Sequence, residues 1–174
     1  AFGVFSGAVY APGPVGVAVD VQNNGILALQ NAATSAGVTA TTLNATTFKI
    51  ENGGSLSLYV SESLTNTGVV AASQSATIAS GANLGVAYAS FVPQVAVGGV
   101  DKFVLITAPT GQLSIDTATV NLYNSSLTTN TISGGSLPFL LKTGQLAQDT
   151  VGTLDRLVLS VVPQPAADLG LTAG

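Results

Sequence analysis

Short stretches of alternating apolar and polar residues recur along this chain, and Gly, Pro or Asn residues interrupt them. The clearest run is Val15–Val21, in which every second residue is valine. Such a period of two predicts a β-strand with one buried face. The same signal predicts strands at Phe48–Ile50 and Leu56–Val60, on either side of the turn residues Glu51–Gly54, an arrangement typical of a β-hairpin.

About ten short strands are expected in all, with no long helical period and no clear internal repeat. Short strands at regular spacing, separated by turn residues, are typical of sandwiches and jelly rolls. A chain of 174 residues suits one domain. The sequence therefore predicts an all-β fold, a single jelly-roll or β-sandwich domain of short antiparallel strands with an N-terminal extension strand.

Charged residues make up only 7% of the chain, and the formal net charge is −4. The 4 basic residues form no cluster, which argues against a nucleic-acid partner. No run of about 18 apolar residues is present, so we predict no transmembrane helix and no membrane partner. With so few charged residues, few charged side chains are available to prevent the edge strands of a sheet from pairing with other chains. We expect these edges to be covered within the fold or to pair with copies of the chain.

The chain contains no His and no Cys. This excludes Ser-His-Asp and Cys-His catalysis, disulfides and zinc sites of the usual kind. Glu51 and Glu62 flank the predicted hairpin and offer the two carboxylates of a glycosidase, but their positions are typical of solvated residues at turns and strand ends. We predict that the protein is not an enzyme and has no cofactor and no metal site.

A translated chain begins with Met, whereas Ala1 stands first here and the sequence contains no Met. Removal of a secretory signal peptide, which is cleaved after small residues, is the simplest explanation. Excision of the initiator Met from a cytosolic protein is the alternative. We expect a secreted protein that is extracellular or on the cell surface. The sequons at Asn44 and Asn124 are glycosylation candidates in turn-like settings, although a chain rich in Ser and Thr also produces sequons by chance.

The segment Ala1–Tyr10 is apolar and uncharged, and a stiff spacer, Pro12-Gly13-Pro14, follows it. An apolar terminal strand of this kind is suited to insertion into a neighbouring subunit, where main-chain hydrogen bonds supply affinity and side-chain pockets supply specificity. We therefore divide the chain into a donor strand with its spacer, residues 1–14, and a β-sandwich, residues 15–174. The alternative is an ordinary first strand that pairs within its own sheet.

The period of two places the expected donor-strand anchors on two faces of this segment, Phe2 and Val4 on one face and Phe5 and Val9 on the other.

The segment Phe48–Leu56 reads FKIENGGSL. It resembles the strand–turn–strand of the TasA/camelysin family of secreted matrix-fibre proteins, and the start, Ala1-Phe2, is similar to the processed N-terminus of that family. The low-charge composition also resembles that of archaeal bundling-pilus subunits, which belong to the same structural group. The resemblance implies a jelly-roll subunit that polymerises when the N-terminal strand of one subunit completes the sheet of the next. Some family members carry a metalloprotease label, which a chain without His does not inherit.

Two classes of function follow from these observations. The first is a structural subunit of an extracellular filament, a pilus or matrix fibre, that forms a head-to-tail homopolymer by donor-strand complementation and bundles with neighbouring filaments in adhesion or biofilm. The second is a non-catalytic β-sandwich binding or coat module, such as a carbohydrate-binding, surface-layer or virion domain. The absence of Trp counts against a sugar-binding face, because such faces usually expose aromatic side chains.

Overall fold

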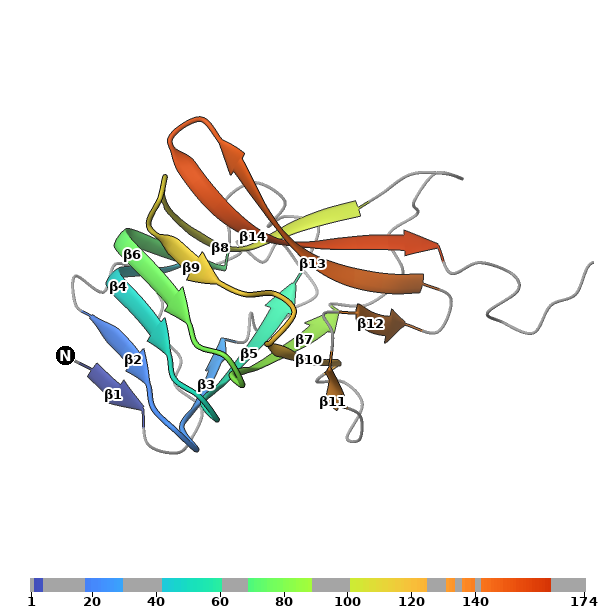
Figure 1. Cartoon of the computed structure of the whole chain (residues 1–174), viewed down its shortest axis with the longest axis horizontal. Helices are drawn as coiled ribbons and strands as arrows, with labels where there is room; N and C mark the ends of the chain where they lie inside the picture. The colour runs from blue at the N-terminus through green and yellow to red at the C-terminus, as the bar shows by residue number, and fades with distance from the viewer. Residues whose placement is uncertain are drawn as a thin grey trace, which may run out of the picture.

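The chain is built from β-strands arranged in two layers (Figure 1). The computed structural model describes residues 2–4, 18–29, 42–60, 69–88, 101–124, 131–133, 136–139 and 142–163. Every regular element in these ranges is a strand, which confirms the all-β fold, and there are 14 strands rather than about ten. They are β1 (Phe2–Val4), β2 (Val19–Val21), β3 (Ile26–Leu29), β4 (Leu43–Ile50), β5 (Ser55–Val60), β6 (Val70–Ile78), β7 (Asn83–Tyr88), β8 (Asp101–Pro109), β9 (Leu113–Ile115), β10 (Asn121–Asn124), β11 (Thr131–Ser133), β12 (Ser136–Phe139), β13 (Lys142–Val151) and β14 (Leu154–Pro163).

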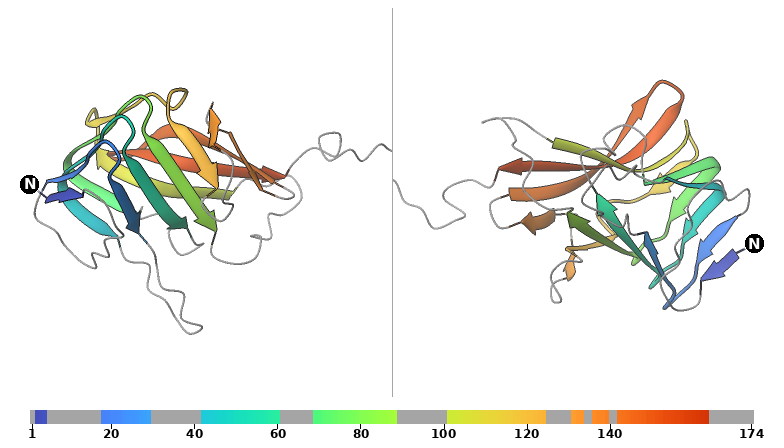
Figure 2. Two further views of the ribbon diagram at one scale, coloured as in Figure 1. Left: turned by 90° about the horizontal axis from the view of Figure 1, so that it is seen from below. Right: turned by 180° about the vertical axis from the view of Figure 1, so that it is seen from behind.

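The strands form two sheets. Sheet A has nine strands in the order β1-β2-β4-β6-β8-β14-β13-β12, with β9 paired to β6. Sheet B has five strands in the order β11-β10-β7-β5-β3. Figure 2 shows both sheets from two further sides, with the N-terminus beside β1 at one end of sheet A.

Four strand–turn–strand units, here called rungs, make up one half of the molecule. Each rung sends its first strand into sheet A and its second strand into sheet B. Rung 1 is β2–β3, rung 2 is β4–β5, rung 3 is β6–β7 and rung 4 is β9–β10. Neighbouring rungs pair in parallel and in register in both sheets. The rungs therefore stack on one another about 4.8 Å apart, the usual spacing of paired strands.

The turn Glu51–Gly54 does not close a hairpin. Its two strands lie in different sheets, where β4 pairs with β2 and β6 while β5 pairs with β3 and β7. Hydrogen bonds instead join one turn to the next, from the Asn24 N–H to the Gly53 carbonyl (3.2 Å) and from the Gly53 N–H to the Gly81 carbonyl (3.1 Å). The alternating pattern predicted both strands correctly but not their partners, because two strands that enclose a shared core show the same alternation as a hairpin.

Antiparallel pairing is likewise wrong for this half of the chain. A jelly roll pairs its strands antiparallel, whereas the rungs pair in parallel and antiparallel pairs occur at β10–β11, β12–β13, β13–β14 and β14–β8. The connection between rungs 1 and 2 spans residues 30–42, which is long enough to return the chain to the starting side. Parallel pairing requires a crossover of about this length.

The chain also contains an internal repeat that the sequence did not reveal. Val19, Phe48 and Ala76 are register partners in sheet A and lie 29 and 28 residues apart. The interval to the next partner, Leu113, is longer, 37 residues. The register partners share apolar character rather than identity, so the repeat appears only when the strands are superposed.

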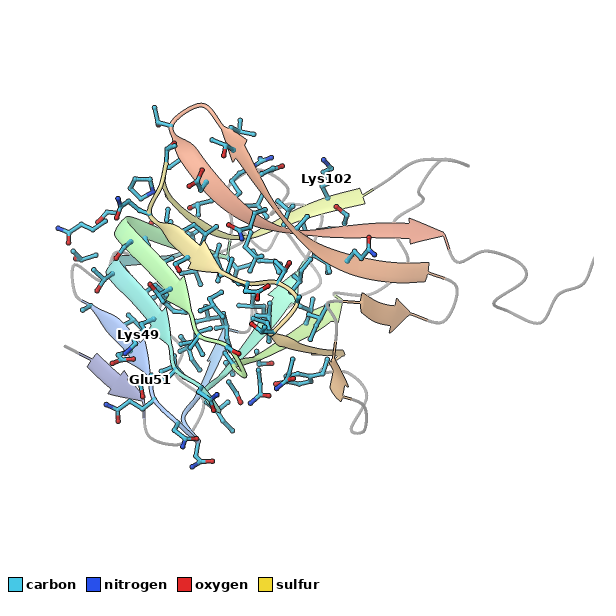
Figure 3. The ribbon with its side chains drawn as sticks, viewed as in Figure 1. Lys49, Glu51 and Lys102 are labelled. Atoms are coloured by element: carbon cyan, nitrogen blue, oxygen red, sulfur yellow. The ribbon has the colours of Figure 1, made fainter. Side chains whose placement is uncertain are left out.

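The core lies between the two sheets of the stack, as Figure 3 shows. Its centre on the side of sheet B is a column of leucines that are register partners and at most 1% exposed: Leu27, Leu56, Leu84 and Leu122. On the side of sheet A, Val21, Ile50 and Ile78 form a matching column, each at most 3% exposed. Burial of such side chains stabilises a fold by roughly 1.5–3 kcal/mol each.

Candidate assembly interface

The stack has two different ends. Rung 1 forms the first end, at which β1 is the edge strand of sheet A and β3 is the edge strand of sheet B. We call this the open end, because in the described part of the chain nothing pairs with the outer side of β1 or β3. Edge strands present unpaired N–H and C=O groups that can pair with another chain. Ile26, on β3, is 45% exposed there.

The strand β1 contains two of the four predicted anchors. Phe2 and Val4 lie opposite Val19 and Val21 in a parallel pairing of β1 with β2. Both opposing valines are buried. In the single chain, then, residues 2–4 pair within their own sheet, and Phe5 and Val9 lie outside the described residues. Insertion of this segment into a neighbouring subunit stays a prediction.

A small group of charged side chains lies beside the open end on sheet A. Lys49 Nζ donates a hydrogen bond of 2.8 Å to Glu51 Oε1, and both side chains are exposed (Figure 3). This hydrogen bond raises the pKa of Lys49 and lowers the pKa of Glu51. Asp20 is the register partner of both Gly3 and Lys49. Its Oδ1 atom is buried without a hydrogen-bond partner, a kind of atom that is uncommon in folded proteins. Glu51 is partly exposed and paired with Lys49, and Glu62, the other carboxylate of the glycosidase alternative, lies outside the described residues.

The opposite end of the stack, at rung 4, is covered. In sheet B, β11 pairs antiparallel with β10. Within sheet A, the β13–β14 hairpin contacts rung 4 through Gln148, whose Nε2 donates a 2.7 Å hydrogen bond to the Ile115 carbonyl. Asp155 Oδ2 accepts a 2.6 Å hydrogen bond from the Gly111 N–H in the turn before β9. We call this the closed end, because these contacts occupy the positions that another rung would take.

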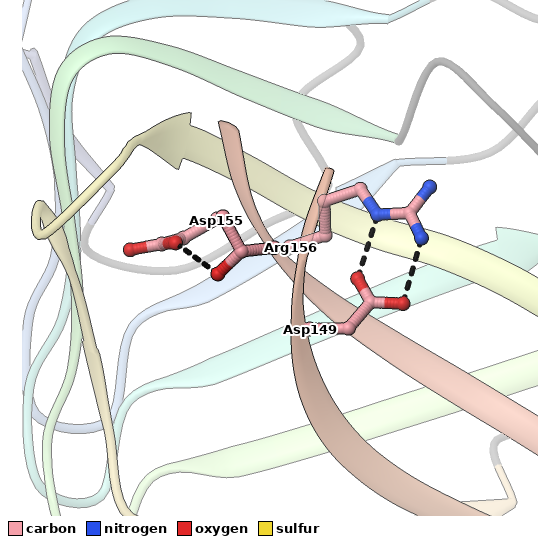
Figure 4. Close-up of polar contacts among 4 residues, drawn as sticks. Asp149, Asp155 and Arg156 are labelled. Atoms are coloured by element: carbon pink, nitrogen blue, oxygen red, sulfur yellow. Dashed lines mark hydrogen bonds and ion pairs between the residues drawn. The ribbon is translucent and has the colours of Figure 1, made fainter. Parts of the chain in front are cut away.

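An ion pair ties the two strands of this hairpin together. Arg156 donates two hydrogen bonds of 2.7 Å to the two carboxylate oxygens of its register partner Asp149 (Figure 4). The Arg156 and Asp149 side chains are 16% and 29% exposed. The hydrogen bonds from Arg156 hold the pKa of Asp149 below its usual value of 3.8, and the charge of Lys102 lowers it further.

Asp149→Asn is expected to lower the free energy of unfolding by about 1 kcal/mol at pH 7, since partly exposed ion pairs contribute on this scale. Because the pKa of Asp149 is lowered by folding, the contribution of the carboxylate is complete above the ordinary pKa and is lost as the pH falls through the folded-state value. The difference between wild type and Asp149→Asn, measured by urea unfolding, should therefore shrink below about pH 3.8. Arg156→Gln and the double variant provide the thermodynamic cycle. A difference independent of pH would contradict the assignment.

The two sequons have different surroundings. Asn44 lies within β4 rather than in a turn, with an exposed side chain whose Nδ2 donates a 3.3 Å hydrogen bond to the Thr42 carbonyl. Asn124 is the last residue of β10, and its side chain lies outside the described part. Glycosylation at either site stays a prediction.

Over the described ranges, the structure holds no group of three or more His, Cys, Asp or Glu side chains placed to bind a metal ion. The same ranges contain no helix with the length and apolar character that crossing a membrane requires. The chain matches no family model, and comparison with curated proteins and with solved structures returns no match. The resemblance to TasA/camelysin proteins therefore stays a prediction.

The sequence did not point to β3 as an edge strand or to the Asp149–Arg156 pair. Nothing in the run Ile26–Leu29 distinguishes an edge from a central strand, because its alternation is the same in both. A signal for the ion pair did exist. Gly152, in the left-handed region with φ of 62°, marks the centre of a tight turn, and a hairpin around it places residues 149 and 156 opposite each other.

Proposed function

We propose that this protein is the structural subunit of a secreted, extracellular filament, and that the filament grows by donor-strand complementation. The N-terminal segment of one subunit joins the open end of the next and takes the place that β1 holds in the single chain. The observation that carries the proposal is the contrast between the two ends of the stack: rung 1 has only the three-residue strand β1 and no further strand of sheet B beside it in the described residues, whereas rung 4 is contacted by β11 and by the β13–β14 hairpin.

The open end has the properties of an acceptor for a strand. Its edge groups can form main-chain hydrogen bonds with an added strand, which is how strand addition gains affinity. Charged side chains, which protect edge strands in other proteins, make up only 7% of this chain. Of the three charged side chains near this end, Lys49 and Glu51 form an ion pair, and the third, Asp20, lies on β2. An apolar strand without charge brings no like charge to this edge.

The described pairing of β1 shows what such an exchange needs. Only three register pairs hold β1 to β2, so an identical segment from a neighbour can replace it with equivalent contacts. In the exchanged state, Phe2 and Val4 stand beside the buried Val19 and Val21. Burial of two large apolar side chains contributes roughly 3–6 kcal/mol before the cost of ordering the segment.

The geometry of the contact favours a filament. The donor segment and the acceptor edge are different surfaces, so each subunit can give one arm and receive another. Contacts of this kind generate open polymers when rotation does not close them into a ring. Neighbouring filaments then bundle through their neutral outer faces, with glycans at Asn44 and Asn124 as a second source of contacts.

Deletion of Ala1–Gly7 tests the proposal. We expect the purified full chain to form filaments without an added factor and the truncated chain to remain folded and monomeric, as measured by electron microscopy, sedimentation and circular dichroism. A synthetic peptide of residues Ala1–Tyr10 should bind the truncated chain, because the open end is then vacant. A full-length variant with Phe2→Asp and Val4→Asp is the matched control for chain length, and it should also fail to polymerise.

Two outcomes would overturn the proposal. The first is a truncated chain that still forms normal fibres, since polymerisation would then not use the N-terminal segment. The second is a full chain that stays monomeric at every concentration, which would favour the binding or coat module.

A further inference from the structure

The two sheets end unequally at the open end. Sheet A extends beyond rung 1 by the strand β1, whereas sheet B ends at β3. In rungs 1, 2 and 3, the strand of sheet A is followed by a turn and then by a strand of sheet B. The strand β1 pairs with the first strand of rung 1 as the first strands of the other rungs pair with one another, and the residues that follow it lie outside the described part.

The register of β1 fixes how the following residues compare with the rungs. Phe2, Gly3 and Val4 are register partners of Val19, Asp20 and Val21. Continuing this alignment places Gly7 at the position of Asn24, which rungs 2 and 3 fill with Gly53 and Gly81. These three residues have φ values of 63°, 75° and 75°, in the left-handed region that favours glycine.

The position after Gly7 is also restricted, in this case to small residues. Ala8 aligns with Gly25, Gly54 and Ala82, all of which are buried in the stack of turns. Gly54 has no room for a Cβ atom, which would lie 2.6 Å from the Val21 carbonyl oxygen, while rung 3 carries an alanine at the aligned position, so each of these rungs has a residue no larger than alanine here. The segment Ser6-Gly7-Ala8 is identical to Ser80-Gly81-Ala82 of rung 3.

The residues after the turn fit the second strand of a rung. Val9 aligns with the exposed Ile26, and Ala11 aligns with Ala28. Tyr10 aligns with Leu27, the first member of the leucine column, so a second strand at this register would extend that column. Pro12 follows immediately and ends the pattern, since proline cannot donate to a sheet ladder.

From this agreement we infer that residues 2–11 are a fifth rung, and that its second strand, Val9–Ala11, pairs in parallel with the edge of β3 on a second copy of the chain. The unit given to the neighbour is then a strand–turn–strand that completes both sheets rather than a single strand. Tyr10 replaces Phe5 among the core anchors, because Phe5 falls in the turn. That the arm comes from another subunit rests on the proposed function; the alignment with β3 does not.

Engineered cysteine pairs test the inference, because the chain contains no Cys of its own. The alignment makes Val9 and Ile26 neighbours about 4.8 Å apart, whereas Val9 and Ala28 are offset by two residues and lie about 8 Å apart. A disulfide does not form across Cα separations above about 7 Å without backbone movement. Under mild oxidation of the full chain, Val9→Cys with Ile26→Cys should form cross-links, and Val9→Cys with Ala28→Cys should form few.

A third pair, Gly3→Cys with Asp20→Cys, reports the described β1–β2 register and serves as the positive control. A reducible ladder of oligomers from Val9/Ile26 supports both the fifth rung and donation by a neighbour. Cross-linked monomers or closed dimers support the fifth rung but overturn the filament proposal. Cross-linking of Gly3/Asp20 without cross-linking of Val9/Ile26, or equal yields from the Ile26 and Ala28 pairs, overturns the fifth rung and leaves single-strand donation intact.

Discussion

Leu84→Ala is expected to lower the free energy of unfolding by about 3 kcal/mol, within the range of 2–5 kcal/mol measured for buried Leu-to-Ala changes. Leu84 is fully buried in rung 3, and its register partners Leu56 and Leu122 lie above and below it in the leucine column. Removing its isopropyl group leaves a cavity between paired main chains, which cannot close without breaking the hydrogen bonds of sheet B. Chemical denaturation followed by circular dichroism measures the loss.

Leu154→Ala is the matched control, because Leu154 is also a leucine on a strand but is 41% exposed and lies outside the proposed interface. Its effect should stay within about 0.5 kcal/mol. If Leu84→Ala does not fold, Leu84→Met keeps the comparison measurable, with an expected loss below about 1.5 kcal/mol. Equal losses from Leu84→Ala and Leu154→Ala would contradict the stacked core.

Gly54→Ala is the second change with a large expected effect, a loss of about 3 kcal/mol at the upper end of typical overpacking costs. The added Cβ would lie 2.6 Å from the Val21 carbonyl oxygen and 3.1 Å from those of Gln22 and Glu51. All three are main-chain atoms, so no side-chain rotation relieves the clash. The turns of rungs 1 and 2 must separate, which also strains the hydrogen bond from the Asn83 N–H to the Gly54 carbonyl (2.8 Å).

Gly152→Ala provides the contrast. Gly152 lies at the exposed tip of the β13–β14 hairpin with a φ of 62°, and a Cβ there meets nothing within 4 Å. Only the cost of a left-handed backbone remains, about 1–2 kcal/mol. Thermal and urea unfolding of both variants compare the two costs. A loss for Gly152→Ala as large as that for Gly54→Ala would show that backbone conformation, rather than close stacking of the turns, explains the effect.

The sequence predicted strands and turns better than it predicted their partners. The alternation in Leu56–Val60 correctly identified a strand, on which Leu56 and Leu58 are buried, and Glu51–Gly54 correctly marked a turn. Alternation reports which side chains are buried, but hairpins and rungs bury the same side chains. The choice between them depends on connections such as residues 30–42, whose length permits a parallel return without encoding it.

The repeat was hidden for a related reason. Register partners such as Val19, Phe48, Ala76 and Leu113 only need to be apolar, and they differ in size at every rung. The third interval is also longer than the first two. The open end exists because rung 1 is the first rung, and the closed end exists because β13 and β14 fold back beside rung 4. The order of the rungs and the position of this hairpin are tertiary features, so no local sequence pattern reports them.

The in-register stack also constrains how a chain of this kind can change in length. Insertion of one residue inside β4 would reverse the faces of every side chain after it in that strand. Insertion of a whole unit of 28 or 29 residues, the intervals seen between rungs 1, 2 and 3, would instead preserve every register partner. Each such duplication would move the open end about 4.8 Å away from the closed end. A subunit of this architecture can therefore become longer only in steps of one whole rung, and each step leaves both ends of the stack unchanged.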